Sequence, residues 1–162
     1  MSHSFGFNRN DTEADYETAE SLLTTLIEAV SRNGNVLLNV GPRATDAGIP
    51  AEQLSRLKAM GEWLRANGDA IYGAGCWERS DGETTDGTPV RFTVRGDRLN
   101  VIPLGRVTGG RMVVRDLEAS GPATVLADGS PVELLREGPD LSLIFKNPPT
   151  GFAPAITIDL GA

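Results

Sequence analysis

The sequence has few of the side chains from which many catalytic and metal centres are built. Cysteine and histidine each occur once among the 162 residues, as Cys76 and His3. One cysteine excludes a disulfide within the chain and a zinc site made of several thiolates. One histidine excludes a His-rich metal cage and argues against a Ser-His-Asp triad. We therefore expect no metal site in this chain.

Basic charge and long apolar runs are also scarce. The 15 Lys and Arg residues face 22 Asp and Glu residues, and the net charge is −7. Because binding to a phosphate backbone requires a concentrated basic surface, this balance argues against a nucleic-acid partner. No apolar run reaches the roughly 18 residues of a membrane span, so we expect no membrane partner. The stretch Met1–Asn10 is polar and has none of the features of a secretory signal.

The composition that remains is that of a globular protein, with 40% hydrophobic and 23% charged residues. Apolar residues recur at helical spacing from Tyr16 to Arg32, and Asp15 or Thr18 could cap this helix. Asn33-Gly34 should end it, with the glycine in the left-handed conformation. A second helix should begin at Pro50 and end at Asn67-Gly68. Its predicted apolar stripe consists of Leu54, Leu57, Gly61 and Leu64, and a glycine there would allow close approach to a sheet.

Between the two helices, Val36–Val40 forms a nearly continuous apolar run bounded by turn residues. Such a run is typical of a strand that is buried on both faces, as in a parallel sheet. An earlier strand would fit at His3–Phe7. Strands and helices would then alternate, which favours an α/β fold for this part of the chain.

After about Trp77 the sequence changes to short segments rich in β-forming residues. Turn sequences such as Arg95–Arg98 and Ala127–Ser130 separate these segments, and the boundary with the first part falls within Gly73–Pro89. The regular spacing predicts an antiparallel all-β sandwich. The expected strands are Val90–Val94, Leu99–Ile102, Arg111–Val114, Ala123–Leu126, Val132–Leu135, Leu141–Phe145 and Ala155–Ile158.

Several segments closely resemble one known family, the α-L-fucosidases of glycoside hydrolase family 29. The segments similar to the end of its catalytic domain are Val30–Pro42, Gly48-Ile49-Pro50, Gly61–Leu64 and Asn67–Tyr72. Phe5-Gly6-Phe7-Asn8 resembles the aromatic-Gly-aromatic-Asn motif that precedes them in this family. Val90–Thr93 and the later strands are similar to the family's C-terminal β-sandwich.

The resemblance implies a (β/α)8-like catalytic barrel followed by a sandwich. A barrel takes about 250 residues. Residues 1–75 would therefore be only the last strands and helices of that barrel, and residues 76–162 would be the C-terminal β-sandwich domain. The family is also retaining, with an Asp nucleophile and a Glu acid/base. No position of this chain corresponds to either carboxylate, so we expect no catalytic residue in it. Because two carboxylates perform the chemistry, we expect no cofactor.

Phe5 is the one substrate-binding residue that the resemblance carries over, as part of the apolar wall against the fucose methyl group. A core aromatic is the alternative interpretation. Asn39, a polar residue in an apolar run, should form a hydrogen bond inside the barrel or contact substrate. The acidic run from Asp11 to Glu20 is better explained by a solvated loop and a helix N-terminus than by a glycosidase pair.

Two functions stay open at this point. The chain could be part of an α-L-fucosidase that releases terminal α-L-fucose, with a fucosylated glycan or a fucoside as its partner. Alternatively, it could be a catalytically inactive accessory domain with a structural or glycan-binding role. Two barrel strands cannot close a barrel, so residues 1–72 should self-associate or meet a partner chain that completes the barrel. Residues 90–160 should fold as a sandwich.

Overall fold

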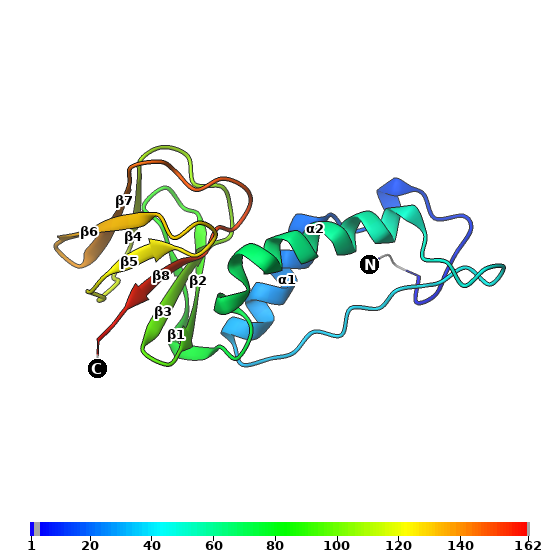
Figure 1. Cartoon of the computed structure of the whole chain (residues 1–162), viewed down its shortest axis with the longest axis horizontal. Helices are drawn as coiled ribbons and strands as arrows, with labels where there is room; N and C mark the ends of the chain where they lie inside the picture. Colours follow the sequence, from blue (N-terminus) through cyan, green and yellow to red (C-terminus); the bar gives the residue numbers. More distant parts are fainter. Residues whose placement is uncertain (2–3, 162) are drawn as a thin grey trace.

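Two long helices precede a β-sheet in the computed structural model, which describes Met1 and residues 4–161 (Figure 1). The α-helices are α1 (Ala19–Ser31) and α2 (Ala51–Asn67), and two 3-10 turns are η1 (Glu13–Asp15) and η2 (Gly68–Ala70). The helices lie side by side, and the segment that joins them runs back along them as an extended trace. No helix among the described residues is long and apolar enough to cross a membrane.

Helix α1 confirms the predicted helix and the predicted cap at Thr18. The Thr18 hydroxyl accepts a hydrogen bond from the Ser21 backbone N–H at 3.1 Å. At the other end Asn33, rather than Gly34, takes the left-handed conformation, with φ of 60°. Asparagine tolerates this region better than most residues, and this leaves the Gly34 N–H free to bond to the Ala29 carbonyl at 2.7 Å.

Helix α2 forms as predicted, but the predicted apolar stripe is not its buried face. Leu54 is exposed, Leu57 and Leu64 are half-buried, and a Cβ on Gly61 would meet no atom within 4 Å. The expected close approach at Gly61 is therefore wrong. The buried face lies beside that stripe around the helix, and it packs against α1 and the second apolar core that includes Ile102 of the sheet. It consists of Gln53, Arg56, Met60, Trp63 and Asn67. Leu64 at the edge of the stripe packs against the core between helices and sheet, whereas Leu54 stays exposed.

The predicted strand at Val36–Val40 is also wrong for this structure. The segment is extended, but it forms no β-ladder within the described residues, and Leu37 is 96% exposed. A strand buried on both faces needs neighbouring strands to supply hydrogen bonds, and none lies here. The predicted strand at His3–Phe7 does not form over Ser4–Phe7, and His3 lies outside the described residues.

An eight-stranded antiparallel sheet makes up the second part, in the order β1-β2-β3-β8-β5-β6-β7-β4. Its two edges meet where Thr84 bridges Val114, so the sheet folds over on itself. This arrangement is consistent with the predicted β-sandwich. The strands are β1 (Gly75–Glu83), β2 (Pro89–Arg95), β3 (Arg98–Pro103), β4 (Arg111–Val114), β5 (Ala123–Val125), β6 (Pro131–Glu137), β7 (Asp140–Phe145) and β8 (Ile156–Asp159).

Seven of these strands fall on the predicted segments, and β1 falls in the stretch expected to be a boundary. Strand β1 has several polar residues and glycines, so neither period-2 alternation nor β-propensity marks it. It pairs with β2 through a register that shifts between Cys76 and Asp81. The neighbouring strand, rather than its own sequence, therefore determines that β1 forms.

Two apolar cores share strand β3. Leu99 and Val101 point into the core enclosed by the sheet, whereas Ile102 belongs to a second core against the helices. Polar groups are paired at this junction. The Trp63 Nε1–H lies 3.0 Å from the Phe152 carbonyl and 3.1 Å from that of Ala153. The helices and the sheet are thus joined by both apolar packing and directed hydrogen bonds.

Candidate functional site

The predicted substrate-binding residue, Phe5, precedes η1 in the chain. Figure 1 shows the segment before η1 at the end of the helical part that is farthest from the sheet. The Phe5 side chain is 89% exposed, so it is not a core aromatic in this structure. Its backbone carbonyl accepts a hydrogen bond from the Asn39 side-chain amide. Asn39 therefore joins two segments that are far apart in sequence. The bond is exposed in this structure, so the expected hydrogen bond inside a barrel stays a prediction.

Gly41 allows these two segments to lie in contact. A Cβ at this position would fall 2.4 Å from the Phe7 backbone nitrogen, so a larger residue cannot occupy it without displacement. The Gly41 N–H donates to the Gln53 Oε1 of α2 at 2.9 Å in a buried bond. The first turns of α2 thus hold the 39–41 segment against residues 5–7.

The loop that follows is held by an ion pair between Arg43 and Asp46. The guanidinium Nη2 lies 2.8 Å from Asp46 Oδ2, and the Gly48 N–H donates to Asp46 Oδ1 at 3.0 Å. The hydrogen bond from Arg43 lowers the pKa of Asp46 to about 2, helped by the Gly48 bond. Asp46 is therefore ionised at neutral pH and acts as an anchor for Arg43 rather than as an acid.

A hollow of about 670 Å³ lies between these two segments. It is lined by Phe7, Asn8, Arg9, Arg43, Ala44 and Thr45, and not by Phe5. The lining offers guanidinium and amide donors beside one aromatic ring, a combination that suits a hydroxyl-rich ligand. No Asp or Glu lies in this lining, so the described residues provide no pair for acid/base catalysis here.

The acidic run before α1 is occupied by structural contacts. Asp11 accepts a hydrogen bond from the Asn8 amide at 2.6 Å, and Glu13 pairs with the buried Arg56 at 2.9 Å. Glu17 accepts from the Ser21 hydroxyl at 2.6 Å, and Glu20 pairs with Arg106 at 2.6 Å. These contacts are additional to the solvated loop and helix N-terminus by which the sequence explains the run. Within the described part of the chain, no group of three or more His, Cys, Asp or Glu residues could hold a metal ion.

Sequence reasoning missed Gln53 and the Arg43–Asp46 pair. Gln53 gave no signal because a single glutamine near a helix start is usually solvated. The Arg43–Asp46 pair was visible only as charges three residues apart in a loop, a spacing that predicts a contact only within a helix.

Comparison with known proteins identifies relatives of this chain. The family model described as "Alpha-L-fucosidase" matches residues 1–69. An α-L-fucosidase from Branchiostoma floridae is 36% identical over 76% of this chain, which spans 26% of that protein. The Thermotoga maritima α-fucosidase, solved in complex with fucose, superposes with a TM-score of 0.88 at 38% identity. That match covers 97% of this chain and 38% of the other.

A further solved structure, α-L-fucosidase isoenzyme 1 from Paenibacillus thiaminolyticus, matches 99% of this chain with a TM-score of 0.81 and 34% identity. The chain spans 38% of that structure. These three relatives are fucosidases by name, which places them among the glycoside hydrolases. The family is that of the α-L-fucosidases, and this chain corresponds to its C-terminal portion, as the residue motifs predicted.

Proposed function

We propose that this chain works as the C-terminal part of a retaining α-L-fucosidase, which releases terminal α-L-fucose from glycans. In this proposal residues 1–75 complete a catalytic barrel and residues 76–162 form the sandwich that supports it. An upstream part supplies the Asp nucleophile and the Glu acid/base, which need no cofactor. The superposition of 97% of this chain on the Thermotoga maritima enzyme carries the proposal.

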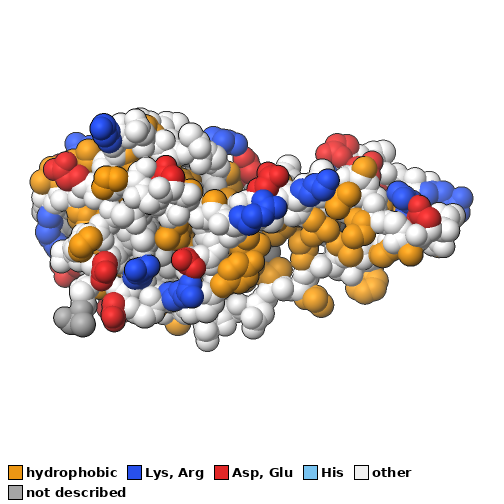
Figure 2. All heavy atoms as spheres, viewed as in Figure 1, with side chains coloured by type: hydrophobic (Ala, Val, Ile, Leu, Met, Phe, Trp, Pro, Cys, Tyr) orange, Lys and Arg blue, Asp and Glu red, His pale blue; other side chains and the backbone are white. Residues whose placement is uncertain are grey.

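The uncovered apolar side of the helical part supports the same conclusion. Figure 2 shows hydrophobic side chains gathered along one side of this part, below a row of charged residues. Large exposed hydrophobic residues in the helical part of the chain include Phe5, Phe7, Val36, Leu37 and Leu54. Contiguous apolar surface of this kind marks an interaction site. The remaining strands and helices of a barrel are the partner that would cover it.

Phe5 has a defined role in this proposal. Its ring extends from a backbone position that Asn39 holds, and no described residue buries it. In a completed barrel the ring would form part of the wall against the fucose C6 methyl group. An aromatic face suits this contact because it packs on C–H surface without needing a polar partner.

A chimera tests the proposed function. This chain would replace the matched C-terminal portion of the Thermotoga maritima α-fucosidase, and hydrolysis of an aryl α-L-fucoside would be measured. We expect the chimera to hydrolyse this fucoside. The isolated chain should be slower by several orders of magnitude, because the catalytic pair acts as a unit. A chimera that folds and binds fucose but does not hydrolyse the fucoside would contradict the proposal.

The alternative is a catalytically inactive accessory domain. One observation favours it for the isolated chain, namely that the hollow beside residues 7–9 and 43–45 contains no carboxylate. The turnover of the chimera distinguishes the two functions. An accessory domain would stabilise the chimera without raising turnover above that of the upstream part alone, whereas a completed fucosidase would restore turnover.

A further inference from the structure

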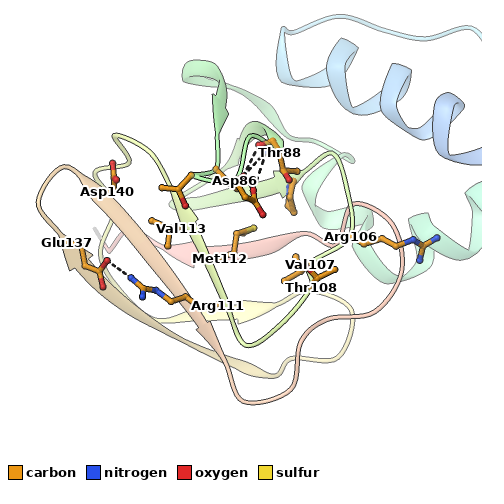
Figure 3. Close-up of a pocket in the computed structure, with 13 residues that line it drawn as sticks. Asp86, Thr88, Arg106, Val107, Thr108, Arg111, Met112, Val113, Glu137 and Asp140 are labelled. Atoms are coloured by element: carbon orange, nitrogen blue, oxygen red, sulfur yellow. Dashed lines mark hydrogen bonds and ion pairs between the residues drawn. The ribbon is translucent and has the colours of Figure 1, made fainter.

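A second hollow, of about 450 Å³, lies on the sandwich. It is formed by the turn between β1 and β2, the loop between β3 and β4, strand β4, and the turn between β6 and β7. Figure 3 shows Met112 in the middle of the labelled residues, with Asp86 and Thr88 on one side and Val107 and Thr108 on the other. Its volume falls within the range of about 300–1,000 Å³ that is usual for ligand sites.

The floor of this hollow is apolar. Met112 is only 8% exposed and Pro103 is buried, while Val107 is half-buried on the loop between β3 and β4. Met112 also belongs to the core enclosed by the sheet, so the floor is held from behind by packed side chains. A ligand in this hollow must therefore present a C–H face to the protein.

The cations at the rim are already paired. The Arg111 guanidinium pairs with Glu137 and also contacts the Ser142 hydroxyl at 3.0 Å. Arg106 pairs with Glu20 of α1 at 2.6 Å, and Figure 3 shows its guanidinium directed away from the centre of the hollow. Neither arginine is therefore free to neutralise an anionic ligand.

The carboxylates at the rim are held in place as hydrogen-bond acceptors. The Thr84 hydroxyl donates to Asp86 Oδ1, and this bond is the main reason why the pKa of Asp86 is lowered. Thr84 is itself buried and accepts from the Thr88 N–H at 2.9 Å, so the turn is fixed without a ligand. Asp140 Oδ1 accepts from the Asp116 N–H at 3.1 Å. Among the described residues, no hydrogen bond reaches the second carboxylate oxygen of Asp86 or of Asp140.

We propose that this hollow binds a neutral saccharide, with its C–H face on Met112 and Val107 and its hydroxyl groups on Asp86 and Asp140. Paired arginines disfavour an anion, and no group of three or more His, Cys, Asp or Glu residues in the described part of the chain could hold a metal ion. A neutral ring with hydroxyl groups at its edge satisfies both parts of the site. The inference rests on the proposed function for its choice of a glycan, and it assigns to the sandwich a contact with the same substrate.

NMR of the ¹⁵N-labelled full chain tests this proposal with fucosyllactose, a neutral trisaccharide, as the probe. We expect saturable shifts of the amides of Thr85, Asp86, Val107 and Met112. Val107→Arg would fill the hollow, and Asp86→Asn would weaken the acceptor while keeping its shape. Each should reduce affinity at least about tenfold, which corresponds to about 1.4 kcal/mol. Both variants should retain a dispersed spectrum.

Ala127→Arg is the matched control, because it adds the same charge at an exposed turn before β6. This turn is away from the hollow, since Glu137, which lines the hollow, lies at the other end of β6. This control should bind like the unmodified chain. Absence of shifts at the hollow, or equal binding by Val107→Arg, would overturn the proposal. Shifts produced by a tri-lysine peptide alone would overturn it in favour of a cationic partner.

The outcome is independent of the chimera experiment. Fucosyllactose shifts confined to residues 5–9 and 43–45 would overturn saccharide binding by the sandwich and leave the proposed fucosidase function standing. Conversely, an inactive chimera together with shifts at Asp86 and Val107 would contradict the proposed function and leave this site in place.

Discussion

At the scale of single residues, Gly41 has the strictest requirement. Gly41→Ala would place a Cβ 2.4 Å from the Phe7 nitrogen, and we expect the contact between the two segments to weaken by about 1–3 kcal/mol. The amide of residue 41, now bonded to Gln53, should exchange its hydrogen faster. Gly61→Ala is the control, because its Cβ meets nothing and alanine should stabilise the helix by about 0.5–1 kcal/mol. Unchanged exchange at residue 41 would contradict this account.

Phe5 can be tested only where fucose binds. In the active chimera, Phe5→Ala should raise the transition-state free energy for an α-L-fucoside by about 1–3 kcal/mol, the scale for loss of a buried apolar contact. The loss should be smaller on a substrate that lacks the C6 methyl group, since that group is the proposed contact. Measurement of kcat/KM on both substrates decides the matter. An equal loss on the two would show that Phe5 only packs.

The Arg43–Asp46 pair makes the loop sensitive to acid. Since the pKa of Asp46 is lowered from 3.8 to about 2, its ionised form stabilises the folded loop above pH 3.8. This contribution is lost as the pH falls through about 2. An NMR titration of the Gly48 amide should therefore show a midpoint near pH 2. Arg43→Gln removes the main cause and should move the midpoint upward, and an unmoved midpoint would exclude the pairing in solution.

At the scale of elements, the sequence predicted those whose stability is local. Helix α1 could be predicted because its spacing and its Thr18 cap lie within one segment, and seven strands because β-rich runs alternate with turns. Val36–Val40 could not be placed in the same way. Its apolar run predicts a strand only when neighbouring strands are present, and the described residues contain none for it. Leu54 on α2 was predicted to lie on the apolar face for the same reason. It is exposed, because no described element packs over it.

The junction between α2 and the sheet should depend on one indole N–H. Trp63→Phe keeps most of the ring but leaves the carbonyls of Phe152 and Ala153 without this donor. We expect a loss of about 1–3 kcal/mol in the free energy of unfolding, measured with urea. Trp77→Phe is the matched control. That indole packs edge-on to Phe92, 5.3 Å between ring centroids, and donates no hydrogen bond identified among the described residues, so its loss should be smaller.

At the scale of the whole molecule, the motifs predicted the family but not the site geometry. The resemblance of Phe5–Asn8 and Val30–Tyr72 identified the fucosidase relatives, because those motifs are specific in order and spacing. The position of the Phe5 side chain and the hollow beside Arg43 depend on contacts between segments about 35 residues apart in sequence, such as the bond from Asn39 to Phe5. No local pattern encodes such a contact.

The uncovered apolar side should make the isolated chain self-associate. Leu37 is 96% and Leu54 38% exposed, and burial of such side chains is favourable in water. We expect light scattering to show an apparent mass that rises with concentration. The double variant Leu37→Glu/Leu54→Glu should stay monomeric, because charges would have to be buried in the contact. Leu135→Glu, at a 47% exposed position on the sheet, should associate like the unmodified chain. A strictly monomeric chain that binds no apolar dye would show instead that the helical part closes its core by itself.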